Sequence, residues 1–292
     1  MKDINGKIAL ITGGAEGIGF HTAKVLGQQG MKLILVDIND DKLQEAVNAL
    51  TNEAIEAEGV VMDVSVRAEW DTLAEKIKNS YGKLHFLMSN AGVSIIGSQR
   101  NMSESDWRWL IDVNLMGVVY GCQMAAPLMK AQEEGGHIMN VASIAGLHGV
   151  SYSGPYCATK AAVVSLSETW RTELAKDGIE VSVLCPGFVK SRIYDSGRIR
   201  QDRYGGQVHF EELVKQKPGL NGNKDVVVNG IDTEIAAARV LEGLMNNDAY
   251  IFTHPHFKQS QIERGEAIKA AFERAEQSPA LKDVPHSGDV FR

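Results

Sequence analysis

The 292-residue chain has few cysteines, no excess of positive charge and no long apolar run, and each shortage excludes a class of protein. Its three cysteines are odd in number and widely spaced, so we expect reduced thiols in a cytoplasmic protein and no disulfide framework. Thirty Lys and Arg residues against 37 Asp and Glu residues give a net charge of -7, which argues against a broad basic surface for nucleic acid or anionic lipid. No window is apolar for long enough to cross a bilayer, and residues 1–10 do not resemble a secretory signal. Small-molecule chemistry remains as the expected role.

Short β-rich runs alternate with longer segments of helical period through the first two thirds of the chain. This alternation is typical of a parallel sheet covered by helices on both faces. Strands are expected at 7–12, 32–37, 60–63, 84–89, 137–142, 180–185 and 249–253. Helices are expected near 17–29, 40–50, 67–79, 104–130, 155–176, 232–245 and 257–275, with a capping box of Ser103 and Asp106 before the fourth. The pattern predicts an α/β fold with a doubly wound, Rossmann-like parallel sheet of about seven strands.

One domain accounts for most of the chain, because no linker separates a second one. We expect a dinucleotide-binding and catalytic domain at 1–256 and a C-terminal helical extension at 257–292 that is not a separate domain. A long polar segment at 187–230, which we call the lid segment, is either a binding lid or a disordered insertion. A binding lid is favoured, since ligand crevices in open α/β sheets lie at the carboxyl ends of the strands.

Two further motifs suggest a ligand but have a simpler interpretation. Four arginines of the lid segment, at positions 192, 198, 200 and 203, could engage a carboxylate. Asp195 and Asp202 interleave with them, which favours a solvated charged loop. The run His254-Pro255-His256 lacks nearby acidic or thiol partners, so it predicts a surface turn and no catalytic metal is expected.

A glycine-rich turn follows the first strand in the sequence Thr12-Gly-Gly-Ala-Glu-Gly-Ile-Gly19. Such a turn lets the backbone approach a pyrophosphate whose charge is received by amides at a helix N-terminus. Asp37, which ends the second strand, can accept hydrogen bonds from the adenosine ribose, and neither position 16 nor the residues directly after Asp37 supply a cation. We therefore expect NAD in preference to NADP. Asp63 and Val64 either meet the adenine or simply end a strand. The residues expected at this end of the cofactor are Gly13, Ala15, Glu16, Gly17, Ile18, Gly19, Asp37, Ile38, Asp63 and Val64.

Tyr156 and Lys160 are four residues apart in an expected helix and would point into the same space. A nearby cation favours phenolate over phenol, so Lys160, helped by the positive charge of an oxidised nicotinamide, is expected to bring the pKa of Tyr156 from about 10 to roughly 7 or 8. Ser143, thirteen residues earlier, can hydrogen-bond the same substrate oxygen. This is acid/base chemistry for an alcohol and carbonyl pair.

Six motifs in order resemble the short-chain dehydrogenase/reductase family, of the NAD-dependent type. They are T-G-x-x-x-G-I-G at 12–19, Asn90-Ala91-Gly92, Asn114, Ser143, Y-x-x-x-K at 156–160 and Pro186-Gly187. The resemblance implies Tyr156 as acid/base, Lys160 as its electrostatic partner and ribose ligand, Ser143 as partner of the substrate oxygen and Asn114 as holder of a relay water. It implies further cofactor contacts at Asn90, Ala91, Gly92, Pro186, Gly187 and Val189, with the Ser191 hydroxyl as the alternative to the Val189 backbone at the nicotinamide amide. It implies substrate contacts at Ser94, Ile95, Ile144, Ala145, Phe188 and Tyr194.

The implied activity is reversible hydride transfer between NAD and a secondary alcohol that is bulky and partly hydrophobic. The run at 250–255 and the long lid segment look similar to those of members that act on aromatic or alicyclic alcohols, including lignin-derived aryl ethers. The family also implies a homodimer or homotetramer formed through the helices at 104–130 and 155–176. An NADPH-dependent carbonyl reductase is the nearest alternative, and a catalytically silent dinucleotide sensor is a third.

Overall fold

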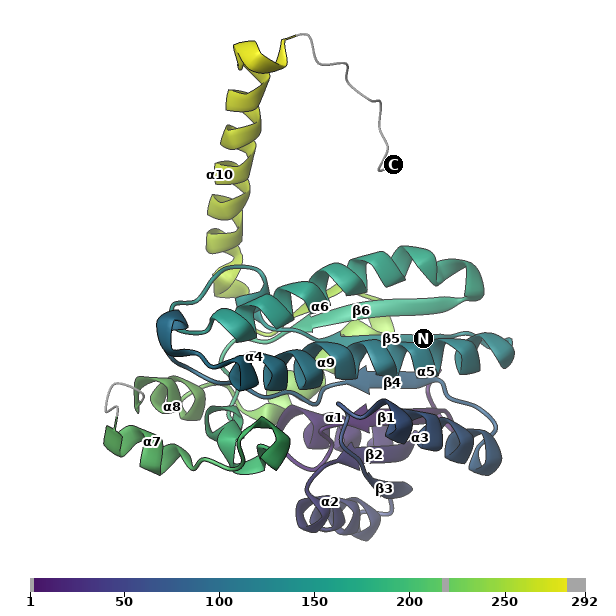
Figure 1. The fold of residues 1–292 in the computed structure, drawn as a ribbon. Coiled ribbons are helices and arrows are strands. Elements are labelled where there is room, and N and C mark those ends of the chain that lie inside the picture. Colours follow the sequence, from purple (N-terminus) through teal and green to yellow (C-terminus); the bar gives the residue numbers. More distant parts are fainter. Residues whose placement is uncertain (1–2, 217–220, 283–292) are drawn as a thin grey trace. The chain divides into compact units, whose positions relative to one another are not determined.

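Residues 3–216 and 221–282 are described by the computed structural model of the chain. In this part of the chain, seven strands form one parallel sheet in the order β3-β2-β1-β4-β5-β6-β7. The strands are β1 (Ile8–Thr12), β2 (Lys32–Asp37), β3 (Ala57–Val61), β4 (Phe86–Ser89), β5 (Gly136–Val141), β6 (Ile179–Cys185) and β7 (Tyr250–Phe252). The order reverses between β1 and β4, which creates a crevice at the carboxyl ends of these strands. The predicted doubly wound sheet is confirmed (Figure 1).

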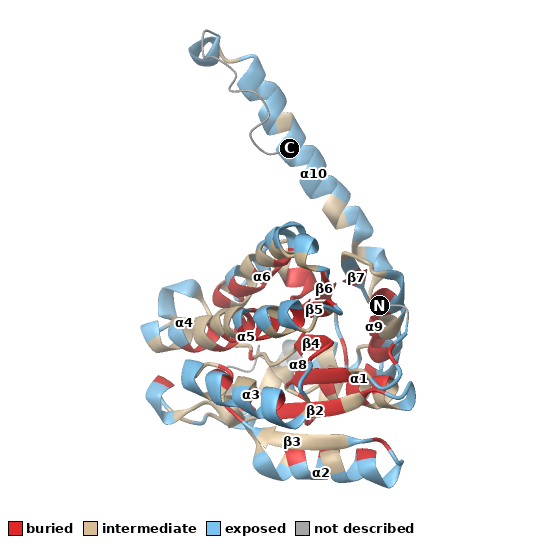
Figure 2. Cartoon of the chain, turned by 90° about the vertical axis from the view of Figure 1, so that its right-hand side faces the viewer, coloured by how far each residue is buried: buried red, intermediate tan, exposed pale blue. Residues whose placement is uncertain are grey.

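Helices cover both faces of the sheet, because each buried strand presents apolar side chains to both sides. In β1, Leu10 belongs to a core cluster with Trp70 of α3, whereas Ile11 belongs to a second cluster with Leu26 of α1. Figure 2 shows α3 and α5 on one side of the sheet and α1 and α9 on the other. The helices are α1 (Gly17–Gln28), α2 (Asp40–Asn52), α3 (Arg67–Ser80), α4 (Glu104–Ile111), α5 (Gly117–Ala131), α6 (Gly154–Glu173), α7 (Phe210–Gln216), α8 (Asn221–Val228), α9 (Thr233–Asn246) and α10 (Lys258–Glu276).

Two predicted elements differ in the structure. The third strand lies at 57–61 and not at 60–63. Its first residues have low β-propensity, so their composition does not indicate a strand. One of them is Gly59, where a side chain would press on Leu43. The long helix expected at 104–130 is divided into α4 and α5 by a π-helical turn at Asp112–Met116, in which Asn114 directs its amide away from the helix. The capping box of Ser103 and Asp106 before α4 is confirmed.

The lid segment contains regular structure that the sequence did not predict. It comprises 3₁₀ turns at Ile193–Ile199 and Asp202–Tyr204, followed by α7 and α8, and its residues 217–220 lie outside the described part of the chain. A bridge between Val189 and Ile231 closes its base. These elements favour the binding lid over a disordered insertion for the described residues, and the role of the segment stays a prediction.

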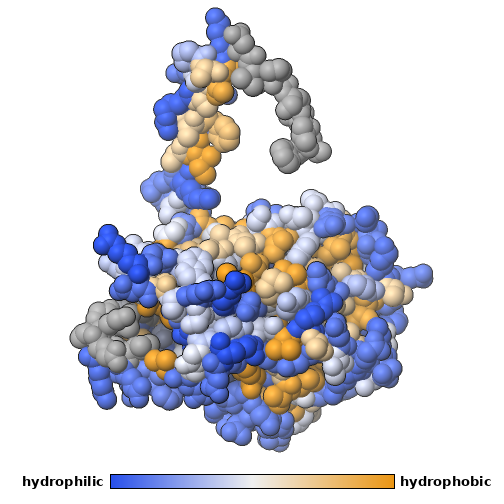
Figure 3. Space-filling view, viewed as in Figure 1, coloured by the Kyte–Doolittle hydropathy of each residue, from blue (hydrophilic) through white to orange (hydrophobic). Residues whose placement is uncertain are grey.

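Contacts divide the chain into two units, one ending at His254 and one beginning at Pro255. The first unit holds the sheet and its helices, and the second holds α10. Figure 3 shows apolar side chains along one side of α10, where Ile262, Ile268 and Phe272 are 46%, 45% and 69% exposed. The expected division at 256 and 257 stays a prediction. Among the described helices, none combines the length and apolarity needed to cross a membrane.

Candidate active site

The glycine-rich turn after β1 is shaped by two glycines with positive φ and by its contact with β4. Gly13 and Gly17 have φ of +62°, and a side chain on Gly13 would lie 2.9 Å from the backbone of Ala91. The Asn90 amide donates hydrogen bonds of 2.9 Å to the carbonyls of Thr12 and Gly13. The N-cap residue of α1, Glu16, makes no side-chain hydrogen bond to the first amides of this helix. Such an uncapped N-terminus suits an anionic group.

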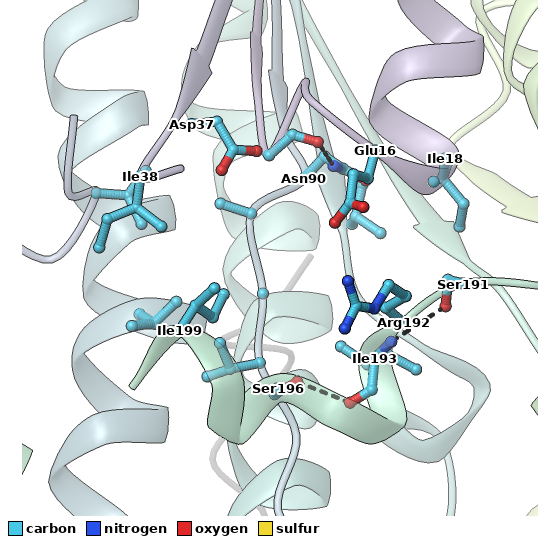
Figure 4. A pocket seen from close by; sticks show the side chains of 18 of the residues that line it. Glu16, Ile18, Asp37, Ile38, Asn90, Ser191, Arg192, Ile193, Ser196 and Ile199 are labelled. Atoms are coloured by element: carbon cyan, nitrogen blue, oxygen red, sulfur yellow. Dashed lines mark hydrogen bonds between the residues drawn. The ribbon is translucent and has the colours of Figure 1, made fainter. Parts of the chain in front are cut away.

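A crevice of about 240 Å³ lies at the carboxyl ends of the strands, and we call it the cofactor crevice. Figure 4 shows Asp37, Glu16 and Asn90 on its sheet side, and Arg192, Ile193 and Ser196 of the lid segment facing them. The predicted site residues that line it are Gly13, Glu16, Gly17, Ile18, Asp37, Ile38, Asp63, Val64, Asn90, Ala91, Gly92, Ser143, Tyr156, Lys160, Pro186, Gly187 and Val189. The structure therefore brings together the glycine-rich turn, the strand-end carboxylates and the Ser, Tyr and Lys set.

Several predicted residues support this crevice without lining it. The Ala15 amide donates to the Asp37 carboxylate at 3.2 Å, and a side chain on Gly19 would strike the Gly13 carbonyl at 2.2 Å. Ile144 and Ala145 are buried in the short turn after β5, where the Ala145 amide donates to Ser143 Oγ at 3.1 Å. Ser94, Ile95 and Tyr194 line a separate cavity, and Phe188 lines neither.

Asp37 is held in place at the end of β2. Its carboxylate accepts hydrogen bonds from the amides of Ala15 at 3.2 Å and Asn39 at 3.1 Å. Burial raises the pKa of Asp37, and the neighbouring Glu16 adds to the increase, while these amide hydrogen bonds oppose it. The carboxylate is therefore fixed in orientation at the point where the sequence predicts a ribose.

The lid arginines are paired, which corrects two expectations. Arg198 donates to Glu16 at 2.8 Å, so a cation does lie beside the glycine-rich turn although none is near it in sequence. The solvated-loop interpretation is wrong for two of the four, since the side chains of Arg198 and Arg200 are only 18% and 10% exposed. The pairs are Arg192 with Asp195, Arg198 with Glu16, Arg200 with Asp106 and Arg203 with Asp63, at 2.6–2.8 Å. Three of them join the lid segment to other elements around the crevice.

Tyr156 and Lys160 lie one turn apart at the start of α6. Lys160 Nζ is 5.8 Å from the centre of the Tyr156 ring and donates to the Val141 carbonyl at 2.7 Å. The side chain of Ser143 lies near enough to the Tyr156 hydroxyl to lower its pKa. Burial raises the pKa of Tyr156, more than the Ser143 contact lowers it, and burial lowers the pKa of Lys160 to about 8. The side chains of Ser143, Tyr156 and Lys160 alone therefore do not give Tyr156 the low pKa that the sequence led us to expect.

Asn114 is completely buried in the π-helical turn and holds two segments together. Its Oδ1 accepts from the Val93 amide at 2.8 Å, and its Nδ2 donates to the Val93 carbonyl at 2.9 Å and to Thr159 Oγ1 at 3.3 Å. It does not line the crevice, but a side chain on Gly92 would lie 3.4 Å from both Asn114 Oδ1 and Lys160 Nζ. In the structure, Asn114 fixes the loop after β4 against α6.

The loop after β6 is fastened to its neighbours. The Gly187 amide donates to Thr253 Oγ1 at 3.1 Å, and the Ile144 amide donates to the Pro186 carbonyl at 2.9 Å. Ser191 lines the crevice together with Val189. This loop is therefore a defined wall beside Ser143 and Tyr156.

Sequence reasoning missed the lid residues on the cofactor crevice. Gln201 donates to Asp63 at 3.0 Å, and Arg203 donates to the same carboxylate at 2.7 Å. Further lining residues that were not predicted are Asn39, Met62, Val93, Trp109, Val113, Val141, Ala142, Arg192, Ile193, Ser196, Arg198, Ile199, Gln201 and Val227. The alternation of arginine and acidic residues in the lid segment indicated ion pairs, but it did not show which residue each arginine contacts.

In the described residues, no group of three or more His, Cys, Asp or Glu side chains is placed to hold a metal ion. The three cysteines are free thiols, and burial raises the pKa of Cys122 and Cys185 to about 12. The expectation that no catalytic metal is needed stays a prediction.

Comparisons with known proteins agree with this geometry. Residues 7–201 match the family model described as short chain dehydrogenase. The chain is 35% identical over 271 residues to a C alpha-dehydrogenase of Sphingobium sp. strain SYK-6, and the alignment covers 92% of this chain and 87% of that protein. A short-chain dehydrogenase/reductase of Burkholderia phymatum, solved in complex with NAD, superposes with a TM-score of 0.86 at 35% identity over 93% of this chain and 97% of that one. L-Sorbose reductase from Gluconobacter frateurii, complexed with NADPH and L-sorbose, superposes with a TM-score of 0.72 at 25% identity over 86% and 97%.

Proposed function

Because this chain belongs to the short-chain dehydrogenase/reductase family of oxidoreductases, we propose that it interconverts a bulky, partly hydrophobic secondary alcohol and its ketone with NAD as cofactor. The observation that carries the proposal is that Ser143, Tyr156 and Lys160 line the same crevice as the glycine-rich turn and Asp37. A binding module without chemistry has no need for that combination, which argues against the dinucleotide sensor.

The chain's own residues fit a dinucleotide. The uncapped start of α1 receives a pyrophosphate, and Asp37 accepts from ribose hydroxyls. The positive φ of Gly13 and Gly17 keeps the turn close to both. Lys160 is the proposed ligand of the second ribose, and the backbone near Val189 is the proposed contact of the nicotinamide amide. When bound in its oxidised form, the nicotinamide accepts the hydride and brings positive charge beside Tyr156.

Tyr156 is the proposed acid and base. It removes the alcohol proton during oxidation and returns it during reduction, while Ser143 holds the same oxygen by a hydrogen bond. Lys160, whose pKa of about 8 leaves most of it protonated at neutral pH, stabilises the phenolate that forms. Asn114 keeps the loop at Gly92 and Val93 against α6, and it is the proposed holder of a relay water.

NAD is favoured over NADP because the Asp37 carboxylate would repel a ribose phosphate. The NAD complex of the Burkholderia phymatum relative supports this choice. An NADPH-dependent carbonyl reductase stays the second candidate, since Arg198 neutralises Glu16 and the L-sorbose reductase relative was solved with NADPH.

The proposed substrate class rests on the surroundings and on one relative. Ile95, Trp109 and Tyr194 line a cavity that shares Trp109 with the cofactor crevice, and a C alpha-dehydrogenase matches most of the chain. We propose an aromatic or alicyclic alcohol. A cytoplasmic homodimer or homotetramer formed through the α4, α5 and α6 surfaces is part of the same proposal, by family resemblance.

The substitution Tyr156→Phe tests the mechanism. It removes the titrating hydroxyl and keeps the ring, so we expect kcat for any accepted alcohol to fall at least 10²-fold, the lower end of the usual contribution of general acid and base catalysis. NAD affinity, measured by fluorescence titration, should change little. Tyr152→Phe is the matched control, because Tyr152 is 64% exposed and precedes α6. Retention of wild-type turnover by Tyr156→Phe would rule the mechanism out.

A further inference from the structure

The first residues of the lid segment lie directly over the glycine-rich turn. A side chain on Gly17 would lie 3.7 Å from Ser191 Cβ, and Ser191 and Arg192 line the cofactor crevice together with Gly13 and Gly17. Gly17 is the first residue of α1, and the amides at a helix N-terminus are where a pyrophosphate is expected to bind. A side chain that the lid segment presents at this point therefore lies beside the negative charges of that group.

Glu16 opposes an anion at this place, and Arg198 cancels its charge. The Glu16 side chain is 36% exposed and lines the crevice, so its carboxylate alone would repel a phosphate. Arg198 Nη2 donates to Glu16 Oε2 at 2.8 Å, and Arg198 Nη1 donates to the carbonyls of Arg192 and Asp195, both at 3.1 Å. Arg198 thus neutralises Glu16 and holds the backbone from which the Arg192 side chain projects.

Arg192 has hydrogen-bond donors that a ligand can reach. Its side chain is 49% exposed, and its Nη2 donates to Asp195 Oδ2 at 2.6 Å. The other N–H groups of this guanidinium have no acceptor among the described residues. In Figure 4 the guanidinium points across the crevice toward Glu16. Arg192 is therefore a cation with unused donors, facing the glycine-rich turn from the lid side.

Asp195, the partner of Arg192, lies on the far side of the guanidinium from the crevice. Its side chain is only 12% exposed and also accepts from the Phe210 amide at 3.3 Å. Asp195 does not line the cofactor crevice but the separate cavity that Tyr194 lines. An anion in the crevice would thus meet the cation before the acid. The pair fixes the guanidinium from the lid side and leaves its other donors free.

We infer that Arg192 is a ligand of the cofactor pyrophosphate, which it contacts from the lid side while the amides of α1 contact it from the sheet side. Arg198 is the positioning residue, because it neutralises Glu16 beside this contact. This inference rests on the proposed function and adds a residue of the lid segment to the cofactor site. Arginine suits the role, since its planar fork of donors matches phosphate oxygens.

The affinities of three ligands test the role of Arg192. NAD and ADP-ribose share the pyrophosphate, and adenosine lacks it. Arg192→Met should weaken NAD and ADP-ribose about 10-fold each, since hydrogen bonds to charged groups contribute on this scale, and should leave adenosine unchanged. Arg192→Lys keeps the charge and should lose less. Titration calorimetry gives Kd for NAD and ADP-ribose, and displacement of ADP-ribose gives Kd for adenosine.

Arg67→Met is the matched control. Arg67 is 45% exposed and pairs with Asp71 at 3.1 Å, but it does not line the crevice. It removes the same net charge from a similar environment, so all three affinities should keep their wild-type values. A dependence on salt provides a second measurement. Raising the ionic strength from about 0.1 M to about 1 M shortens the screening length from about 10 Å to about 3 Å, and it should weaken ADP-ribose less in Arg192→Met than in the wild type.

A double-mutant cycle tests the role of Arg198. Arg198→Met leaves the Glu16 carboxylate unpaired, so ADP-ribose should bind about 10-fold more weakly. In the Glu16→Gln background the same change should cost little, because no charge is left to neutralise. Glu16→Gln alone should bind ADP-ribose at least as tightly as the wild type. An equal loss in both backgrounds would contradict the positioning role. If Arg198→Met does not fold, the Arg192 series still decides the main inference.

Three outcomes would overturn the assignment of Arg192. They are wild-type affinity for ADP-ribose in Arg192→Met, an equal loss for adenosine and ADP-ribose, which would indicate a structural role, or a loss confined to NADP, which would place Arg192 at the ribose phosphate. In each case NAD-dependent oxidation of an alcohol by the wild type shows that the proposed function survives. A wild type that binds neither NAD nor ADP-ribose would overturn both.

Discussion

Tyr156 and Lys160 show how burial and charge oppose each other at one site. Spacing alone predicts an acidic tyrosine beside a protonated lysine, but burial raises the pKa of Tyr156 and lowers that of Lys160 to about 8. Removal from water disfavours the charged form of each group, so both effects favour neutral side chains. At neutral pH Lys160 still carries most of its charge. In the proposed mechanism, catalysis by Tyr156 therefore requires the positive charge of the oxidised cofactor in addition to that of Lys160.

We propose that the preference for NAD over NADP depends on Asp37. We expect Asp37→Ser to lower kcat/KM for NAD roughly 10-fold, because the charge-assisted hydrogen bonds to the ribose are lost. We also expect it to raise the ratio of kcat/KM for NADP to that for NAD at least 10-fold, because Arg198 neutralises Glu16 and no unpaired carboxylate then repels the ribose phosphate. The measurement is kcat/KM for both cofactors with one alcohol. Asp40→Ser is the control, since it removes the same charge from an exposed position three residues later. An unchanged ratio in Asp37→Ser would place the discrimination elsewhere.

The sequence predicted single crevice residues where they belong to short motifs whose members also lie together in the structure. Asp37, Gly13 and Tyr156 belong to motifs with fixed spacing, and all three line the crevice. The partner of Glu16 was not predictable, because Arg198 lies 182 residues away and side chains in a lid follow no period. The same holds for Gln201 and Arg203 on Asp63.

At the scale of elements, the strands were predictable because β-rich runs buried on both faces are distinct in composition. The division of the helix at 104–130 was not, since it results from tertiary contacts of Asn114 with Val93 and Thr159. The sequence indicated Asn114 as unusual within a helix but not the π-helical turn that relieves it. The predicted bounds of the edge strand β3 were wrong because its β-strand pattern is weak.

The interior of β5 carries a pH-sensitive element of stability. His137 is fully buried, with Nε2 2.9 Å from Ser182 Oγ, and burial lowers its pKa to about 3. Below pH 6.5 the unfolded chain binds a proton at this residue that the folded chain does not, so stability falls as pH falls from 6.5 toward 3. Between pH 7 and 5 the expected loss is about 2 kcal/mol.

His137→Leu should remove this part of the loss. Urea unfolding at pH 7 and pH 5 gives the free energy of unfolding of each protein, and comparing each with itself cancels any change in packing. We expect the wild type to lose about 2 kcal/mol more than the variant over this interval. An equal loss in both would mean that His137 is protonated in the folded protein.

At the scale of the whole molecule, the cofactor crevice joins segments that follow strands from β3, at one edge of the sheet, to β6. Residues of β2, the loops after β3, β4 and β6 and the start of α6 all line it, and the lid segment is tied to the glycine-rich turn by Arg198 and to the end of β3 by Arg203. The reversal of strand order between β1 and β4 fixes where this crevice lies, and the alternating pattern of the sequence was sufficient to predict it. Its closure by the lid depends on ion pairs that no pattern reveals.

A ligand that spans these segments must stabilise them together. NAD at 100 times its Kd should add about 2.7 kcal/mol to the free energy of unfolding. For a chain of this size that corresponds to an increase in Tm of roughly 4 to 5 °C. Differential scanning fluorimetry across an NAD titration measures the shift, which should be logarithmic in concentration well above Kd. NADP at equal concentration should give a smaller shift in the wild type, because its phosphate meets Asp37. The same difference should diminish in Asp37→Ser, and an absence of any NAD-dependent shift at millimolar concentration would contradict binding across the crevice.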